Sequence, residues 1–272
     1  MSPWKTRPVG APASATAAST SPAGRMAALA RAEFTLLGRS KGTLVAALFV
    51  PLLLPVSVRS AAQGMDLESA GLSVATVVLP AALGFSLLFA VYASLVGVFV
   101  ARREELVLKR LRTGELRDVE ILAGAALPAA GTGLVQSLVL TAGSAALFDL
   151  GAPRAPYYAV PGFLLGLLMC VALAALTSAF TRSTESAQVT TAPLILLSLA
   201  GSGLMVPLPL MPDRLAAACE LLPLTSVITL VRGGWTGELP VPEALRALAA
   251  ALAWTLIAVF AVRRWFRWEP RR

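Results

Sequence analysis

The stretch LSVATVVLPAALGFSLLFAVYASLVGVFV, Leu72 to Val100, contains no charged residue. A helix of roughly 20 apolar residues is long enough to cross the hydrocarbon core of a bilayer, and this run exceeds that length. Backbone polar groups cannot stay unpaired in lipid, and the run lacks the alternation that is typical of barrel strands. The stretch is therefore predicted to be a membrane-spanning helix.

Five further apolar runs repeat this pattern along the chain. They lie within Thr43–Val58, Ile121–Phe148, Ala159–Phe180, Gln188–Met211 and Ala244–Val262. The first is short and contains two prolines, so it is expected to be kinked or extended into the preceding segment. With 57% hydrophobic and 14% charged residues, the composition also favours a membrane protein. The sequence predicts an all-α polytopic membrane protein with six transmembrane helices.

The positions of lysine and arginine predict the orientation of these spans. If both termini are cytoplasmic, 18 of the 23 basic residues fall in inner segments. The outer segments then hold only Arg59, Arg154, Arg214, Arg232 and Arg246. Both termini are therefore expected in the cytoplasm of a multi-pass protein of the plasma membrane.

Two more segments are apolar without being clear spans. Ala27–Gly38 is predicted to be an interfacial helix that leads into the first span. Arg214–Trp235 contains Glu220, Pro223 and Arg232, and a full crossing would place the C-terminal arginines outside. We therefore expect a re-entrant hairpin that enters from the outer face, where it acts as a gate or as a simple cap.

These segments predict three regions. Residues 1–24 form a disordered cytoplasmic tail rich in Pro, Ala, Ser and Thr, residues 25–265 form the six-span domain, and residues 266–272 form a basic cytoplasmic tail.

The densest charge follows directly after the opening stretch, in ARREELVLKRLRTGE, Ala101 to Glu115. A helix from Glu104 to Arg112 would align Val107, Leu108 and Leu111 in one apolar stripe and place Glu105 four residues before Lys109. Thr113-Gly114 supplies a stop signal. A charged loop that fixes topology remains the simpler interpretation, but acids mixed with bases beside an apolar stripe favour docking to a soluble partner.

Residues that could carry catalysis are nearly absent from the sequence. There is no histidine, and the lysines follow Trp4, Ser40 and Leu108, so no phosphate-binding loop exists. Cys170 and Cys219 are expected in apolar surroundings rather than in a metal site. We predict no enzyme activity, no cofactor or metal in this chain, and no nucleic-acid partner. No ionisable side chain lies deep in a predicted span, which disfavours an ion-coupled carrier.

Four motifs resemble those of type-2 ATP-binding-cassette (ABC-2) exporter permeases. RREELVLKRLRTG is similar to the cytoplasmic motif E-R-E-x-G-T-L-x-x-L-R-x-x-P, with Leu106-Val107 in place of Gly-Thr. The other three motifs follow in the family's order. They are Thr181–Glu185, then Pro193 with Gly201–Gly203 and Pro207–Pro212, and then Leu221–Gly237. In the last motif, Leu222 stands where the family has Asn. The resemblance covers about Met26 to Trp265.

The resemblance implies a role for the charged stretch. In this family the loop between spans two and three forms a coupling helix that docks in a groove of a separate ATPase subunit, which holds ATP and magnesium. It implies that Leu108 and Leu111 fill the groove while Glu104, Glu105 and Arg112 set its register by charge pairing.

The function implied is that of a permease subunit of an ATP-driven exporter in a bacterial plasma membrane, in contact with membrane lipids. It would act as a homodimer, or paired with a similar subunit, and would move a hydrophobic or amphipathic drug, antibiotic or lipid, as in multidrug efflux and antibiotic resistance. A secondary carrier without ATP and a membrane scaffold are the alternatives, and an intramembrane enzyme is disfavoured because no catalytic set is present.

Overall fold

The computed structural model describes Gly24, Arg59, Ser60, Gly64, Leu67 and residues 71–113, 117–148 and 151–269. The regular elements whose bounds lie within these ranges are all helices. They are α4 (Val74–Ser86), the π-helix η3 (Leu87–Ala93), α5 (Ser94–Glu104), α6 (Val107–Arg112), α7 (Asp118–Phe148), α8 (Pro156–Phe180), α9 (Ala187–Gly201), the 3₁₀ helix η4 (Leu208–Leu210), α10 (Asp213–Cys219), α11 (Pro223–Thr236) and α12 (Val241–Trp265).

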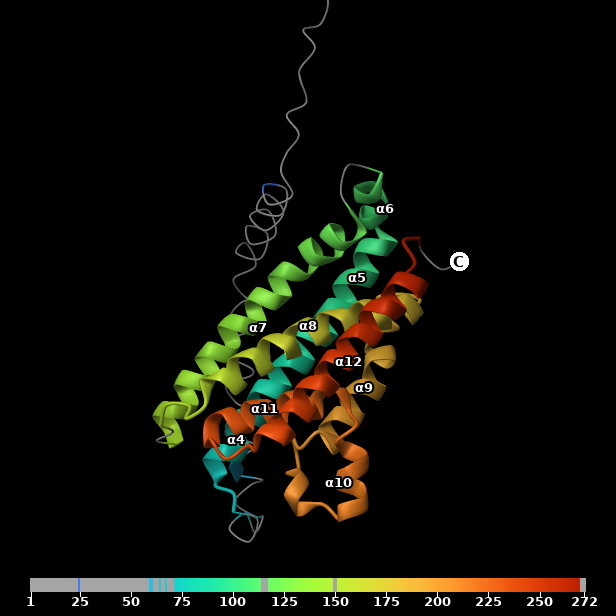
Figure 1. Cartoon of the computed structure of the whole chain (residues 1–272). Coiled ribbons are helices and arrows are strands. Elements are labelled where there is room, and N and C mark those ends of the chain that lie inside the picture. Colours follow the sequence, from blue (N-terminus) through green and yellow to red (C-terminus); the bar gives the residue numbers. More distant parts are fainter. Residues whose placement is uncertain are drawn as a thin grey trace, which may run out of the picture.

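Four helices in the described part of the chain are long and apolar enough to cross a membrane. One is the continuous helix Val74–Glu104, made of α4, η3 and α5, and the others are α7, α8 and α12. They run alongside one another in an elongated bundle (Figure 1). The predicted all-α membrane fold is confirmed, and these helices occupy four of the six runs that hydropathy singled out.

The remaining predicted spans have a different outcome. α9 has 15 residues, fewer than a straight span requires. α10 and α11 pass the span criteria only as a pair, and they are bent by 100° relative to each other. The tail 1–24, the interfacial helix Ala27–Gly38 and the span Thr43–Val58 lie outside the described residues, apart from Gly24 in the tail. The count of six spans and the re-entrant hairpin therefore remain predictions.

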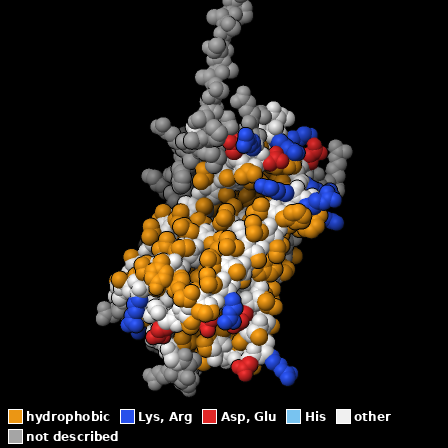
Figure 2. Space-filling model, viewed as in Figure 1, with side chains coloured by type: hydrophobic (Ala, Val, Ile, Leu, Met, Phe, Trp, Pro, Cys, Tyr) orange, Lys and Arg blue, Asp and Glu red, His pale blue; other side chains and the backbone are white. Residues whose placement is uncertain are grey.

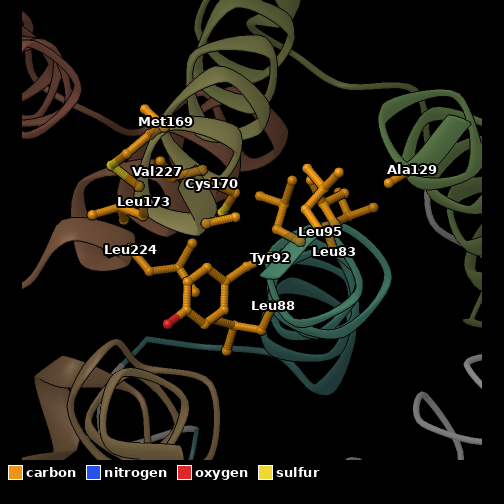
Figure 3. Packing of buried hydrophobic residues seen from close by; sticks show 14 of the residues in the cluster. Leu83, Leu88, Tyr92, Leu95, Ala129, Met169, Cys170, Leu173, Leu224 and Val227 are labelled. Atoms are coloured by element: carbon orange, nitrogen blue, oxygen red, sulfur yellow. The ribbon is translucent and has the colours of Figure 1, made fainter. Parts of the chain in front are cut away.

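The core of the bundle lies where α8 meets η3, α5, α11 and α12. Figure 3 shows the Tyr92 ring of η3 beside Leu224 of α11, with Leu173 of α8 farther along the same cluster. α11 is buried along most of its length. It lies so close to α8 that a Cβ atom on Gly234 would clash with the backbone nitrogen of Ala159. Small residues permit such close helix contacts in membranes, where lipid offers no hydrophobic drive for association.

Buried polar side chains add specific links between the spans. Ser86 Oγ donates to Gln136 Oε1 at 3.0 Å, which joins α4 to α7. The Tyr92 hydroxyl and Thr177 Oγ1 are 3.0 Å apart, which joins η3 to α8. Hydropathy predicted one regular helix here, whereas the structure inserts seven π-helical residues in mid-span. Such segments widen a helix and are frequent at functional sites.

Charged side chains gather at the two ends of the molecule, and a belt of hydrophobic side chains lies between them (Figure 2). We call these ends the α6 end and the α10 end after the helices found there (Figure 1). Exposed apolar side chains on the long helices, such as Leu138 of α7, Leu164 of α8 and Leu256 of α12, form part of this belt. A soluble protein rarely exposes so continuous an apolar surface, so the belt fits contact with lipid.

Basic residues are concentrated at the α6 end. Among the described basic residues from Gly71 onward, those at the α6 end are Arg102, Arg103, Lys109, Arg110, Arg112, Arg117, Arg182, Arg263, Arg264 and Arg267. Those toward the other end are Arg154, Arg214, Arg232 and Arg246.

Candidate functional site

The charged stretch folds into the short helix α6, separated from α5 by a turn at Glu105 and Leu106. This turn corrects the prediction of one continuous helix from Glu104 to Arg112. Leu106 has φ 60°, in the left-handed region, and it is the only described non-glycine residue with positive φ. The helix ends at Arg112 with Thr113 as C-cap, as the stop signal predicted.

The left-handed turn lies at a position where this chain differs in sequence from the resembling family. The family has Gly there, and this chain has Leu106. Glycine adopts positive φ without steric cost, whereas a residue with a Cβ atom is strained by about 1–2 kcal/mol. Leu106 nevertheless keeps 39% of its surface exposed, so its apolar side chain is presented to the surroundings.

The apolar residues of α6 face in different directions. Leu108 is 0% exposed, on a helix that packs against α5 and α7. Its burial corrects the assignment of Leu108 to a partner's groove, because the side chain anchors α6 within this chain instead. Leu111 is half-buried, and Lys109, Arg110 and Arg112 are exposed. The surface that α6 offers is therefore basic, with Leu106 and part of Leu111 as its apolar elements.

The charge pairs of α6 also differ from the predicted ones. Glu104 and Glu105 are exposed, on the last residue of α5 and in the turn, so Glu105 does not share a helix with Lys109. Lys109 Nζ instead lies 2.8 Å from Glu269 Oε1 of the C-terminal segment. Arg112 forms an ion pair with Asp118 at the start of α7, with Nε and Oδ1 3.1 Å apart.

The C-terminal segment that follows α12 is part of this site. The Arg112 guanidinium carbon lies 4.9 Å from the centre of the Trp268 ring, within the range of a cation–π contact. The ring of Phe266 packs edge-on against Trp268 at 5.0 Å. The sequence predicted only a basic tail here, so its attachment to α6 is a finding of the structure.

One residue of the site, Arg103, was not singled out by sequence reasoning. It is 1% exposed, and its guanidinium donates to the carbonyl of Ser178 at 2.8 Å and to the carbonyl of Thr181. These carbonyls end α8, where the helix dipole is negative and its last carbonyls lack partners in the helix. Arg103 therefore ties the end of α5 to the end of α8. Only its position one residue before the predicted docking helix could have signalled this role.

The bend between α10 and α11 is held by side chains from two directions. Thr225 Oγ1 donates to the carbonyl of Cys219 at 2.7 Å, and Trp254 Nε1 of α12 donates to the carbonyl of Leu221 at 2.9 Å. Two residues of the predicted outer gate lie at this bend: Glu220 is the exposed C-cap of α10, and Pro223 begins α11.

Arg232, the third predicted gate residue, lies in the last part of α11. Its Nε and Nη2 atoms are buried and have no hydrogen-bond partner. The indole Nε1 of Trp235, one turn further along, is in the same situation. Both side chains line a cavity of about 690 Å³ at the α10 end.

The two groups of predicted residues lie at opposite ends of the bundle and do not form one site (Figure 1). The described residues contain no group of three or more His, Cys, Asp or Glu that could hold a metal ion. The chemistry available at the α6 end is ion pairing and hydrogen bonding, which suits mechanical contact with a partner.

The model of the ABC-2 type transporter family matches residues 25–235. No curated protein matches the sequence. Because the family match covers most of the chain, the chain belongs to the ABC-2 type transporter family. It is a transmembrane permease component of an ABC transporter, and membership implies partnership with an ABC ATPase.

Proposed function

Because the chain is an ABC-2 type permease, we propose that it is the membrane subunit of an ATP-driven exporter that moves a hydrophobic or amphipathic molecule out across the plasma membrane. In this proposal the chain crosses the membrane six times and the α6 end and both termini are cytoplasmic, because basic residues favour the inner side. ATP and magnesium belong to the partner ATPase, and a second permease copy completes the path.

The observation that carries the proposal is the attachment of α6 to several spans at once. α6 packs on α5 and α7, and Arg112 pairs with Asp118 of α7. Lys109 pairs with the segment that follows α12, and Arg103 joins α5 to α8. A force applied to α6 by a partner therefore reaches α5, α7, α8 and α12, which is what coupling to an ATPase requires.

The contact surface for the ATPase is built from the exposed residues of α6 and its entrance turn. Leu106 and Leu111 supply apolar contact, while Glu104, Glu105 and Arg110 supply charge of both signs. Arg112 contributes through its position between Asp118 and Trp268 rather than as a free charge. Mixed charge around a small apolar centre suits a specific interface with a soluble protein.

Reversing one exposed charge of α6 tests this surface. Arg110→Glu should weaken co-purification of the ATPase, identified as a stoichiometric soluble protein with a phosphate-binding loop, by about tenfold or more, because like charges across an interface are strongly unfavourable. ATP-dependent uptake of an amphipathic fluorescent dye into inverted membrane vesicles should fall in parallel.

Arg264→Glu is the matched control, because Arg264 is an exposed arginine at the same end but on α12. It should leave both the ATPase contact and dye uptake close to wild type. Equal effects of the two substitutions would show that only net charge matters, and the absence of any ATPase with the wild-type chain would favour the carrier or the scaffold instead.

A further inference from the structure

The strongest unexplained feature of the molecule is the unpaired guanidinium of Arg232. Neither Nε nor Nη2 has a hydrogen-bond partner, although both are buried. These two N–H groups lie on one edge of the guanidinium, the edge that binds carboxylates and phosphates through two parallel hydrogen bonds. A buried charge without a partner is costly, since the group loses water and gains nothing in exchange.

The surroundings of Arg232 are closed on one side and open on the other. On the closed side, Nη2 lies 3.6 Å from the point where a Cβ atom of Gly203 would stand, in the turn after α9. On the open side, Arg232 lines the cavity of about 690 Å³ at the α10 end. Nη1 is not among the buried unpaired atoms, so it is the nitrogen that remains accessible. A counter-charge can therefore reach Arg232 from the cavity.

Two other features make this cavity attractive to an anion. The buried, unpaired indole N–H of Trp235 belongs to a side chain that lines the same cavity. The N-terminus of α4 also borders it through Ser73 and Thr76, and a helix N-terminus carries partial positive charge. Two elements, α11 and α4, thus offer donors or positive potential to one space.

The other charged residues that line the cavity have a weaker influence. They are Arg154, Glu238 and Glu243, and all three are exposed. Solvent and salt screen such charges over short distances, whereas a largely enclosed guanidinium is screened much less. Apolar lining from Leu72, Pro209 and Leu239 suits a ligand that carries an apolar body as well as an anionic group.

We propose that this cavity binds the carboxylate or phosphate group of an amphipathic anion, with Arg232 and Trp235 as the groups that hold it. This proposal rests on the proposed exporter function. It names an anionic amphipath as the class of molecule that the exporter handles at the α10 end. The binding itself requires no ATPase.

The test uses the purified full-length chain without ATPase, so that its failure is distinct from failure of the exporter function. A ligand that binds the folded state raises its unfolding temperature in proportion to the logarithm of its concentration. Inorganic phosphate in detergent and phosphatidylglycerol in lipid nanodiscs are the probes. Sodium chloride at equal ionic strength and phosphatidylcholine are their respective controls.

We expect the unfolding temperature to rise with phosphate, with phosphatidylglycerol, or with both, and the responding probe distinguishes a free oxyanion from a lipid headgroup. Arg232→Gln, which removes the charge, should lower the affinity for that probe by about tenfold or more, as expected for loss of a charge-assisted hydrogen bond. Arg154→Gln, an exposed arginine of the same cavity, should retain the response.

Three results would overturn the proposal. They are no response to either probe, a response of equal size to chloride or phosphatidylcholine, and an unchanged response in Arg232→Gln. If Arg232→Gln does not fold, Trp235→Phe removes the second donor while keeping an aromatic ring, and it should then weaken binding severalfold.

Discussion

Two arginines with buried guanidinium nitrogens, one at each end of the bundle, have opposite environments. At the α6 end, Arg103 donates two hydrogen bonds to the carbonyls that end α8. At the α10 end, Arg232 lies beside the turn that follows α9, but its Nε and Nη2 atoms have no partner. The first arginine joins two helices, whereas the second holds a charge that this conformation leaves unbalanced.

This difference separates a structural arginine from a functional one. A buried charge that donates hydrogen bonds to two carbonyl groups fixes geometry, and removal of either partner is strongly destabilising. A buried charge without partners lowers the stability of the state in which it is found, and native proteins retain such groups where binding or a second conformation supplies the missing partner. The comparison therefore supports the two proposals made above, a mechanical link at the α6 end and an anion-binding cavity at the α10 end.

The largest expected effect is the loss of the Arg103 link. Arg103→Met leaves the carbonyls of Ser178 and Thr181 without their donor in a buried site, so unfolding should become easier by about 2–4 kcal/mol. Thermal or denaturant unfolding of the purified chain in detergent measures this change. Arg264→Met, which alters an exposed arginine at the same end, should change stability by less than about 0.5 kcal/mol. Equal stability of the two variants would contradict the role given to Arg103.

The opposite sign is expected at Arg232. In anion-free buffer, Arg232→Met removes an unpaired buried charge and keeps an apolar side chain, so it should raise the free energy of unfolding by about 1–2 kcal/mol. Arg154→Met, in the same cavity but exposed, should be close to neutral. A marked loss of stability in Arg232→Met would show that the guanidinium is structural, and the comparison of the two arginines would no longer hold.

A smaller gain in stability is expected from Leu106→Gly, because glycine adopts the left-handed conformation at φ 60° without strain. The gain should be about 1 kcal/mol. Leu106→Ala is the matched control: it removes the same apolar side chain but keeps the Cβ atom, so it should bring no gain. If Leu106 contacts the ATPase, both variants should weaken ATPase co-purification, which separates the strain of the turn from the role of the side chain.

The smallest effect concerns the C-terminal segment. Glu269→Gln removes the ion pair with Lys109, whose side chains are both more than half exposed, so stability should change by less than about 1 kcal/mol. The change should diminish as salt is added, because exposed ion pairs are screened. A loss that is larger than this and independent of salt would show that the segment is a structural part of the α6 end.

Much of the fold could be predicted because hydropathy is a property of consecutive residues. The uncharged run Leu72–Val100 predicted the long helix Val74–Glu104, and the stop signal at Thr113 predicted the end of α6. The motifs that run from Arg102 to Gly237 predicted the family that the comparison confirmed. The 100° bend between α10 and α11 lies within Arg214–Trp235, the segment for which the sequence predicted a hairpin.

The candidate site could be predicted only in part, because side-chain direction depends on neighbours that are distant in sequence. The periodicity of Leu108 and Leu111 placed both on one stripe, but α5 and α7 bury Leu108 and leave Leu111 half-exposed. Periodicity also predicted a pair between Glu105 and Lys109. The turn at Leu106 separates them, and Lys109 pairs instead with Glu269.

The sequence by itself determined that this protein is a helical membrane permease of the ABC-2 type with a charged element after one of its spans, because length, hydropathy and motif order are local along the chain. Only the tertiary structure decided which arginine is paired. Arg103 meets acceptors 75 and 78 residues away, while Nε and Nη2 of Arg232 meet none. A hydrogen bond requires atoms to approach within about 3 Å in a defined direction. Folding sets such distances, and no pattern of neighbouring residues encodes them.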